Sequence, residues 1–245
     1  SDADSTDTIT YSLDDDAGGR FAIDATTGVV TVADGTLLDR EAAASHGITI
    51  RATSSDSSFS TQSFTISLNA LNDSDPTITS NGGGSVAAVN VAENVAAVTT
   101  VIAVDPDLPA QTLTYSIVGG ADAALFTIDA NSGVLTFIAA PNFEAPTDAG
   151  GDNVYNVSVQ VSDGAGRIDA QDLAVTVTPV NETPVAQTEN YAVTANQSIT
   201  LAGPGVLGND SDPDGDPLTA VLISGPQHGT LTFNAGNGND KLTID

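Results

Sequence analysis

The sequence contains no cysteine, methionine or tryptophan, and aromatic residues make up only 4% of it. Without cysteine, no disulfide can stabilise the fold and no zinc site can be built from thiolates. No apolar run reaches the length of about 18 residues that a membrane-spanning helix needs, so we expect no membrane insertion. The lack of methionine and of a signal-peptide pattern predicts an excised or processed fragment.

Positive charge is also scarce, with five lysine and arginine residues against 32 aspartate and glutamate residues and a net charge of −27. This excess repels itself and disfavours a compact state unless counter-ions neutralise it. It argues against nucleic acid and anionic membrane surfaces as partners. Bound divalent cations would relieve the repulsion, and adaptation to a high-salt habitat is the alternative explanation.

Groups suited to catalysis are few. His46 and His228 are the only histidines, both lie next to glycine, and no Gly-x-Ser-x-Gly motif is present. A zinc site would need a cluster of histidine or cysteine ligands. We therefore predict that the protein is not an enzyme.

What the sequence does contain is a repeated Asp-x-Asp motif, at residues 2–4, 105–107 and 212–214. The copies begin 103 and 107 residues apart (105 − 2 and 212 − 105), and each precedes a strand-like run. A period near one hundred suits one small β-domain. We therefore expect three modules: residues 1–76, which lack the first strands, a complete module at 77–182, and a partial one at 183–245.

Short alternating segments between turns predict the strands of these modules. In the first module we expect strands at 9–13, 21–24, 29–32, 47–53 and 60–68, with one helical turn at 41–45. The second should have them at 86–91, 95–104, 113–118, 126–137 (a hairpin), 154–161 and 172–177, and the third at 190–193, 198–201, 218–222 and 228–233. This pattern predicts an all-β fold of tandem Greek-key, seven-stranded β-sandwich modules in an elongated array.

Four motifs carry a resemblance to a known family: Leu38-Asp39-Arg40-Glu41, Asp105-Pro106-Asp107, Ala92-Glu93-Asn94 and Val161-Ser162-Asp163. Together they resemble the LDRE, DxD, xEN and AxD motifs of tandem cadherin-like repeats, as found in large bacterial, calcium-dependent (RTX-type) surface adhesins. The third module is more similar to a variant bacterial type. The resemblance covers essentially the whole chain.

In that family, calcium ions lie at the junctions between repeats, and carboxylate and carbonyl oxygens are the ligands that Ca²⁺ prefers. The resemblance implies that the first junction uses Asp39, Glu41, Asn72, Asp73, Asp105, Asp107 and Asp163. At the second junction it implies Glu93, Glu144, Asn181, Glu182, Asp212 and Asp214. Asp2 and Asp4, with Asp56 as a further candidate, would form a half-site.

The chain departs from the family pattern in ways that affect the second junction more. Ala70 and Pro179 stand where the first linker aspartate is expected, and Asn142-Phe143-Glu144 replaces the LDRE motif in the second module. The second junction should therefore bind fewer or weaker calcium ions. The alternative for each aspartate is a role as an ordinary turn residue, which needs no ion.

The resemblance implies calcium-rigidified extender or adhesion modules of a secreted or cell-surface bacterial protein. The alternative is a module that binds carbohydrate, such as a cell-surface glycan, or another copy of itself, including filament formation. The candidate residues for that alternative are Phe143, Tyr155 and the insertion at 142–153.

Overall fold

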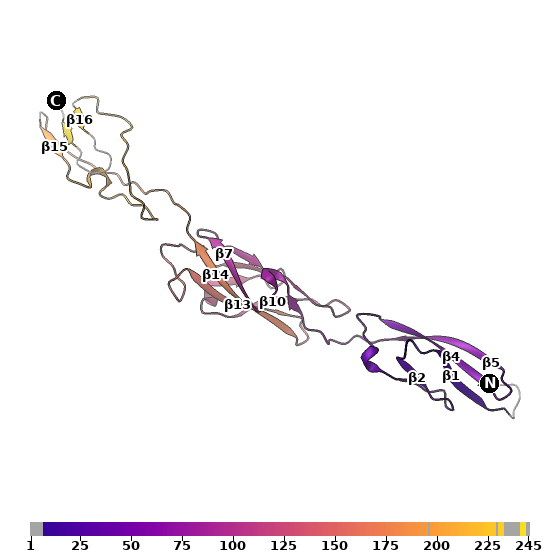
Figure 1. Cartoon of the computed structure of the whole chain (residues 1–245). Helices are drawn as coiled ribbons and strands as arrows, with labels where there is room; N and C mark the ends of the chain where they lie inside the picture. The colour runs from indigo at the N-terminus through magenta and orange to yellow at the C-terminus, as the bar shows by residue number, and fades with distance from the viewer. Residues whose placement is uncertain (1–6, 196, 229, 233–240, 244–245) are drawn as a thin grey trace. The chain divides into compact units, whose positions relative to one another are not determined.

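The computed structural model describes residues 7–195, 197–228, 230–232 and 241–243 (Figure 1). The secondary structure of these residues is β-strand with short 3-10 turns, so the all-β prediction is confirmed. None of the described helical segments has the length and apolar character needed to cross a membrane. The chain divides into two compact units: unit 1 holds residues 1–88, 99–136 and 156–174, and unit 2 holds 89–98, 137–155 and 175–245.

The first strands of unit 1 form an antiparallel sheet of order β1-β4-β5, accompanied by the hairpin β2-β3 (Figure 1). Alternation of apolar residues explains the sheet, because residues two apart share a face. Cross-strand pairing places Tyr11 opposite Ala52 and Ile48 opposite Phe64 on one face. The bounds are β1 Ile9–Asp15, β2 Phe21–Ile23, β3 Val30–Val32, β4 Ser45–Ser54 and β5 Phe59–Ser67.

The next strands form a sheet of order β10-β13-β14-β7, a sheet of order β11-β12-β8 and the pair β6-β9. β6 lies in a segment predicted to be linker, and the strand predicted at 95–104 is divided into β8 and β9. The others lie close to the predicted segments, with ends that differ by a few residues. The bounds are β6 Thr77–Ile78, β7 Val86–Ala92, β8 Ala97–Thr100, β9 Ala103–Val104, β10 Thr114–Gly119, β11 Phe126–Ile128, β12 Val134–Phe137, β13 Val154–Ser162 and β14 Ile168–Thr178.

Strands β13 and β14 supply the core by strict alternation. In unit 1, the side chains of Val157, Val159 and Leu173 are at most 1% exposed. In unit 2, those of Tyr155 and Val177 are equally buried. Full burial of such a side chain contributes about 1.5–3 kcal/mol, so these two strands provide much of the stability.

The hairpin turn between β2 and β3 is repeated between β11 and β12. Asp24 Oδ1 accepts the backbone N–H groups of Thr26 and Thr27. In the second turn, Asp129 Oδ1 accepts the backbone N–H groups of Asn131 and Ser132. Gly133 closes the second turn at φ 70°, and an added Cβ would lie 2.1 Å from the Val101 carbonyl oxygen. The sequence match between the two hairpins is thus a match of turn geometry.

The last strands belong to unit 2 and form a sheet of order β15-β17-β16. The bounds are β15 Ser198–Thr200, β16 Thr230–Thr232 and β17 Lys241–Thr243. The prediction of strands at 190–193 and 218–222 was wrong, because both segments are irregular. Val221 and Ile223 are 74% and 91% exposed. An apolar run forms a strand only where a neighbouring strand pairs with it, and the described residues provide none here.

The buried carboxylate of Asp148 organises the backbone of the insertion at 142–153. Asp148 is 7% exposed, and its carboxylate accepts the backbone N–H of Asp152 and Asn153 at 3.0 and 3.1 Å. Burial opposes its charge, but backbone donors of Asp152, Asn153 and Gly151 outweigh burial and lower its pKa below 3.8. We expect Asp148→Asn to lower the free energy of unfolding near neutral pH by about 1–2 kcal/mol, since one N–H loses its acceptor.

Because the folded-state pKa of Asp148 is lowered, its contribution is present above pH 3.8 and is lost as the pH falls through the folded-state value. Urea unfolding at neutral and acid pH measures this, and the parent and D148N curves should converge in acid. Asp152→Asn, at an exposed neighbour, is the control. Equal stability of D148N and the parent at neutral pH would contradict the prediction.

Candidate metal centre

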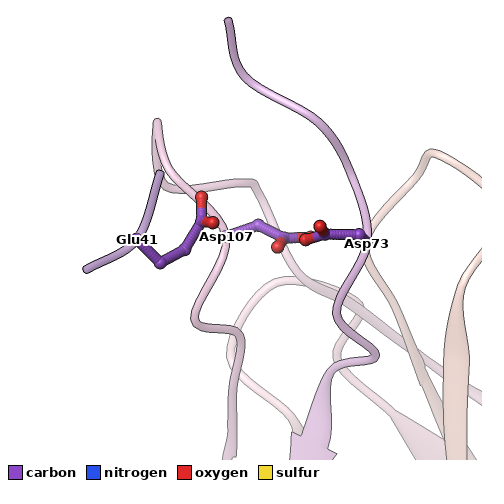
Figure 2. A group of neighbouring side chains, drawn as sticks. All are labelled: Glu41, Asp73 and Asp107. Carbon is purple, nitrogen blue, oxygen red and sulfur yellow. The ribbon is translucent and has the colours of Figure 1, made fainter. Parts of the chain in front are cut away.

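Three carboxylates from separate parts of unit 1 converge on one point, which we call the first cluster. Glu41, Asp73 and Asp107 each offer an oxygen atom, and these atoms all lie within 4.8 Å of one another. Figure 2 shows the carboxylate of Glu41 directed toward that of Asp107, with Asp73 reaching in from the other side. Three negative charges at this spacing repel strongly in a partly buried site, so the arrangement favours a bound cation.

Glu41 is held in place by a turn that begins at Asp39. The Oδ1 atom of Asp39 accepts the backbone N–H of Glu41 and Ala42 at 2.9 and 3.0 Å, and its carbonyl accepts that of Ala43. This single turn, at residues 39–43, stands close to the helical turn predicted at 41–45. Asp39 thus caps the turn, and within the described residues the carboxylate cluster does not include it.

Asp107 is fixed by a second turn. Its own N–H donates to Asp105 Oδ1 at 3.0 Å, and both of its carboxylate oxygens lie 3.3 Å from the backbone nitrogen of Ser74. Glu41 reaches the same loop, because its Oε1 accepts the N–H of Leu108 at 3.2 Å. Asp107 is only 1% exposed. The loop at 105–108 and the segment that contains Asp73 are therefore tied together around the cluster.

Two oxygen atoms beside the cluster are buried and have no hydrogen-bond partner among the described residues. They are Oδ2 of Asp105 and Oε1 of Gln111. Buried polar atoms are nearly always paired, so these orphans indicate a missing partner. Both are oxygens, as Ca²⁺ prefers, and the residues present therefore fit a calcium ion.

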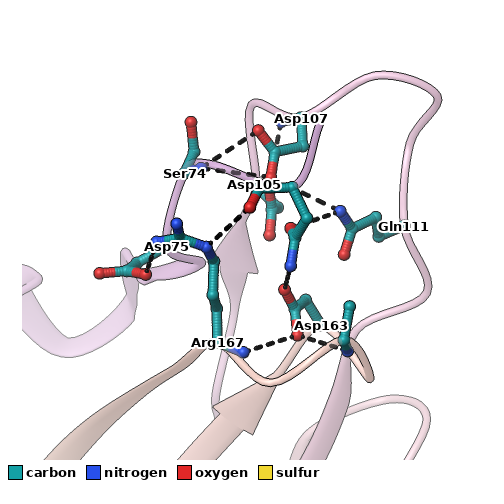
Figure 3. A network of polar contacts seen from close by, with 9 residues as sticks. Ser74, Asp75, Asp105, Asp107, Gln111, Asp163 and Arg167 are labelled. Carbon is teal, nitrogen blue, oxygen red and sulfur yellow. Dashed lines mark hydrogen bonds and ion pairs between the residues drawn. The ribbon is translucent and has the colours of Figure 1, made fainter. Parts of the chain in front are cut away.

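The remaining predicted residues of the first junction form an adjoining hydrogen-bond network (Figure 3). Asn72 Nδ2 donates to Asp163 Oδ2 at 2.8 Å, and Asn72 Oδ1 accepts from Gln111 at 2.7 Å. Arg167 donates to the Asn72 carbonyl at 3.1 Å and pairs with Asp75 at 2.6 Å. This network orders the linker, and it occupies the oxygens of Asn72 and, with the backbone N–H groups of Ala165 and Arg167, both carboxylate oxygens of Asp163.

The pKa values of this network reflect the same contacts. Burial opposes the charge of Asp163, but donors that include the Ala165 N–H and the Asn72 side chain outweigh it and lower the pKa of that carboxyl. The hydrogen bond to Asp75, followed by the negative charges of Asp75, Asp107 and Asp73, raises the pKa of Arg167. The neighbouring carboxylates thus stabilise the positive charge of Arg167.

A second cluster lies in unit 2 and consists of Glu93, Glu144 and Asp214. One carboxylate oxygen from each lies within 4.8 Å of the others. Glu93 is 1% exposed, and its two oxygens accept the N–H groups of Phe143 and Val180 at 2.9 and 2.7 Å. These two backbone bonds lower its pKa. Loss of solvation, and then the negative charges of Glu93 and Asp214, raise the pKa of Glu144, whose side chain nevertheless stays exposed.

Asp212, Asn181 and Glu182 support this second cluster. Asp212 Oδ1 accepts the N–H of Asp214 at 3.0 Å, which repeats the turn of Asp105 and Asp107. The N–H of Glu182 donates to Asp214 Oδ2 at 2.6 Å, and the side chain of Glu182 accepts from Asn94 at 2.7 Å. Asn181 Nδ2 donates to the Glu182 carbonyl at 3.0 Å. Glu182 is therefore used in hydrogen bonds beside the cluster.

The two clusters share two positions and differ at the third. Glu41 corresponds to Glu144, and Asp107 to Asp214, by their place in the repeated turns. Because Ser74 and Glu182 make the same backbone contact, the counterpart of Asp73 is Asn181, which carries no charge. The third carboxylate of the second cluster comes instead from Glu93, which follows β7.

Three predicted residues lie elsewhere. Asp2 and Asp4 fall outside the described residues, and Asp56 accepts the N–H of Ser58 at 2.8 Å in the turn between β4 and β5. Sequence reasoning missed Gln111 and Arg167. A signal for Arg167 was available, since it is one of only five basic residues in a strongly acidic chain.

Comparison with known families gives two matches. Residues 87–178 match the family described as "Cadherin domain", and residues 181–245 match the family described as "Bacterial Ig domain". The expected cadherin resemblance is therefore confirmed for the middle of the chain.

Related proteins agree with the first match. The chain is 27% identical over 249 residues to human Protocadherin Fat 1, covering 96% of this chain and 5% of that protein. It is 32% identical over 148 residues to mouse "Cadherin-related family member 2", covering 59% of this chain and 11% of that one. The chain thus spans only a small part of the length of these relatives.

Solved cadherin structures are also similar to this chain. The crystal structure of mouse Cadherin-23 EC22-24 superposes with a TM-score of 0.58 at 28% identity, covering 70% of this chain and 53% of that one. The crystal structure of human CDH23 EC21-23 gives a TM-score of 0.65 at 18% identity, covering 97% and 79%, and supports the fold alone.

Proposed function

We propose that this chain consists of calcium-binding, cadherin-like extender or adhesion modules of a secreted or cell-surface bacterial adhesin. The observation that carries the proposal is the convergence of Glu41, Asp73 and Asp107 beside the unpaired Asp105 oxygen. Glu41, Asp73 and Asp107 would hold the ion at the first cluster, with Asp105 beside them. Glu93, Glu144 and Asp214 would hold one at the second. Bound calcium would supply the positive charge that offsets the repulsion among the three carboxylates of each cluster.

The division into modules 1–76, 77–182 and 183–245 is part of this proposal. The cadherin match at 87–178 and the bacterial Ig match at 181–245 support it. In this division each cluster lies where one module meets the next, since Glu41 and Asp107, or Glu144 and Asp214, belong to neighbouring modules. Bound calcium would then restrict how the modules move and stiffen the array.

The proposal is tested by calcium titration in a calorimeter together with small-angle scattering. We expect at least one calcium ion to bind each cluster, with the first cluster the tighter, because its network includes the orphan oxygens of Asp105 and Gln111. Calcium should narrow the distribution of molecular dimensions, and a chelator should broaden it. Magnesium is the control, because it dehydrates reluctantly and demands a stricter geometry. No heat of binding and identical scattering with and without calcium would overturn the proposal.

The carbohydrate-binding alternative depended on Phe143, Tyr155 and the insertion at 142–153. Tyr155 is 1% exposed and packs edge-on against Phe137, with ring centroids 5.1 Å apart. Phe143 is half-buried beside Glu93. A buried tyrosine cannot stack on a sugar, so Tyr155 gives no support to a glycan partner. Sedimentation with and without calcium tests the remaining alternative, self-association.

A further inference from the structure

Asp73 differs from the other two carboxylates of the first cluster, because no hydrogen bond holds its own side chain among the described residues. The carboxylate of Glu41 accepts the Leu108 N–H at 3.2 Å, and that of Asp107 lies 3.3 Å from the backbone nitrogen of Ser74. Asp107 is 1% exposed, whereas Asp73 is exposed. The position of Asp73 therefore depends on the residues that flank it in the chain.

The guanidinium group of Arg167 contacts the linker segment 72–75 on both sides of Asp73. Its Nε atom donates to the carbonyl of Asn72, one residue before, at 3.1 Å. Its Nη1 atom donates to Oδ1 of Asp75, two residues after, at 2.6 Å (Figure 3). A guanidinium is a planar, rigid fork of donors that can hold two acceptors at once. Arg167 therefore spans the segment that presents Asp73.

Arg167 is itself fixed by the turn between β13 and β14. Asp163 Oδ1 accepts the N–H groups of Ala165 and Arg167 at 2.8 and 3.1 Å, and the Asp163 N–H donates to the Arg167 carbonyl at 3.3 Å. Gly164 and Gly166 have φ angles of 76° and 108° in this turn, which other residues rarely adopt. The predicted ligand Asp163 thus directs Arg167 toward the linker segment, and it does so without an ion.

Arg167 has two opposing effects on a cation at the first cluster. The hydrogen bond to Asp75, and then the charges of Asp75, Asp107 and Asp73, raise the pKa of Arg167, so its positive charge is close enough to repel an arriving cation. However, the side chain is 34% exposed, and water and salt screen such a charge. Its two hydrogen bonds order the backbone around Asp73 beforehand, and the ion then need not supply the conformational entropy of that ordering.

We infer that Arg167 is a positioning residue of the first cluster, which clamps the linker segment so that Asp73 is in place for calcium. The inference rests on the proposed function, since it concerns the ion that Glu41, Asp73 and Asp107 would hold. The clamp itself needs no ion, because both of its hydrogen bonds join groups of this chain. It therefore has a measurable consequence in chelator as well as in calcium.

The test is a calorimetric calcium titration of the full chain with Arg167→Gln, together with hydrogen exchange of the Ser74 amide in chelator. R167Q should weaken calcium binding at the first cluster by about tenfold, the equivalent of leaving roughly one backbone residue to be ordered by the ion. The Ser74 amide, which faces Asp107, should exchange about tenfold faster in chelator. Binding at the second cluster should not change.

Three further variants separate the clamp from the charge. Arg167→Lys keeps the charge but lacks the planar fork, and it should weaken calcium binding as R167Q does. Asp75→Ala removes one end of the clamp, and the double variant R167Q/D75A should bind about as weakly as R167Q. The matched control is Arg51→Gln, which removes a guanidinium that pairs with Asp14 between β4 and β1. R51Q should leave both measurements unchanged.

Tighter calcium binding by R167Q would mean that charge repulsion is the larger effect, and it would overturn the inference. Parent-like calcium binding by R167K would do the same, as would equal exchange of the Ser74 amide in R167Q and the parent. If the parent itself bound no calcium, the proposed function would fail and with it the role of Arg167 toward calcium. Faster exchange in R167Q would in that case still establish the clamp.

Discussion

Replacement of Asp107 by asparagine is expected to weaken calcium binding at the first cluster by about 100-fold, or about 2.7 kcal/mol. The substitution removes one of three carboxylate charges within 4.8 Å of one another and changes the volume very little. In a partly buried site, a unit charge about 4 Å from another interacts with an energy of about 4 kcal/mol at an effective dielectric constant near 20. A loss of this size is therefore reasonable after solvation is included.

The protein should stay folded, because the asparagine oxygen can still accept the backbone N–H of Ser74. The measurement is a calorimetric titration with calcium, with the unfolding temperature in chelator as a check on folding. Asp129→Asn is the matched control, since Asp129 also lies in unit 1 and accepts backbone N–H groups in a turn. It lies outside both clusters and should leave the titration unchanged.

If D107N and D129N bound calcium as the parent does, Asp107 would be a turn residue only. Asp214→Asn separates the two sites further, since it should remove the second binding event and leave the first. If D107N or D214N lost both calcium-binding events, the two clusters would not bind calcium independently. That result would contradict the assignment of a separate calcium site to each cluster.

The family resemblance named the residues that meet, and local turns that repeat in the sequence explain how some of these carboxylates are presented. The Asp-x-Asp turn closes through a bond between residues two apart, 107 to 105 and 214 to 212, each at 3.0 Å. Such a turn has the same geometry wherever the residues recur. The motif at 38–41 likewise encodes its own turn through Asp39. All six carboxylates of the two clusters are among the ligands that the family resemblance implied.

What the sequence did not reveal depends on contacts between distant segments. Arg167 reaches Asp75 across 92 positions, and Gln111 reaches Asn72 across 39. No local pattern specifies such pairs. The same holds for the apolar run at 218–222, which has the alternation of a strand but no strand beside it among the described residues. Alternation indicates a tendency to pair, and pairing needs a neighbour.

Glu93 should matter for folding even without calcium, in contrast to Glu144 of the same cluster. Both of its oxygens accept backbone N–H groups, of Phe143 and Val180, inside the protein. We expect Glu93→Ala to lower the free energy of unfolding in chelator by about 3–5 kcal/mol, because two buried donors lose their acceptor and a cavity remains. Chemical denaturation of the full chain in chelator measures this loss, and calcium should restore little of it.

Glu144→Gln provides the opposite result at the same cluster. Glu144 is exposed, and the charges of Glu93 and Asp214 help to raise its pKa, so its charge is unfavourable when no cation is bound. Its removal should leave stability in chelator equal to or above that of the parent, yet weaken calcium binding at the second cluster. Glu93 would then act mainly as an anchor between the backbone at 143 and at 180, and Glu144 mainly as a ligand. Equal losses of stability in E93A and E144Q, both in chelator, would contradict this division of roles.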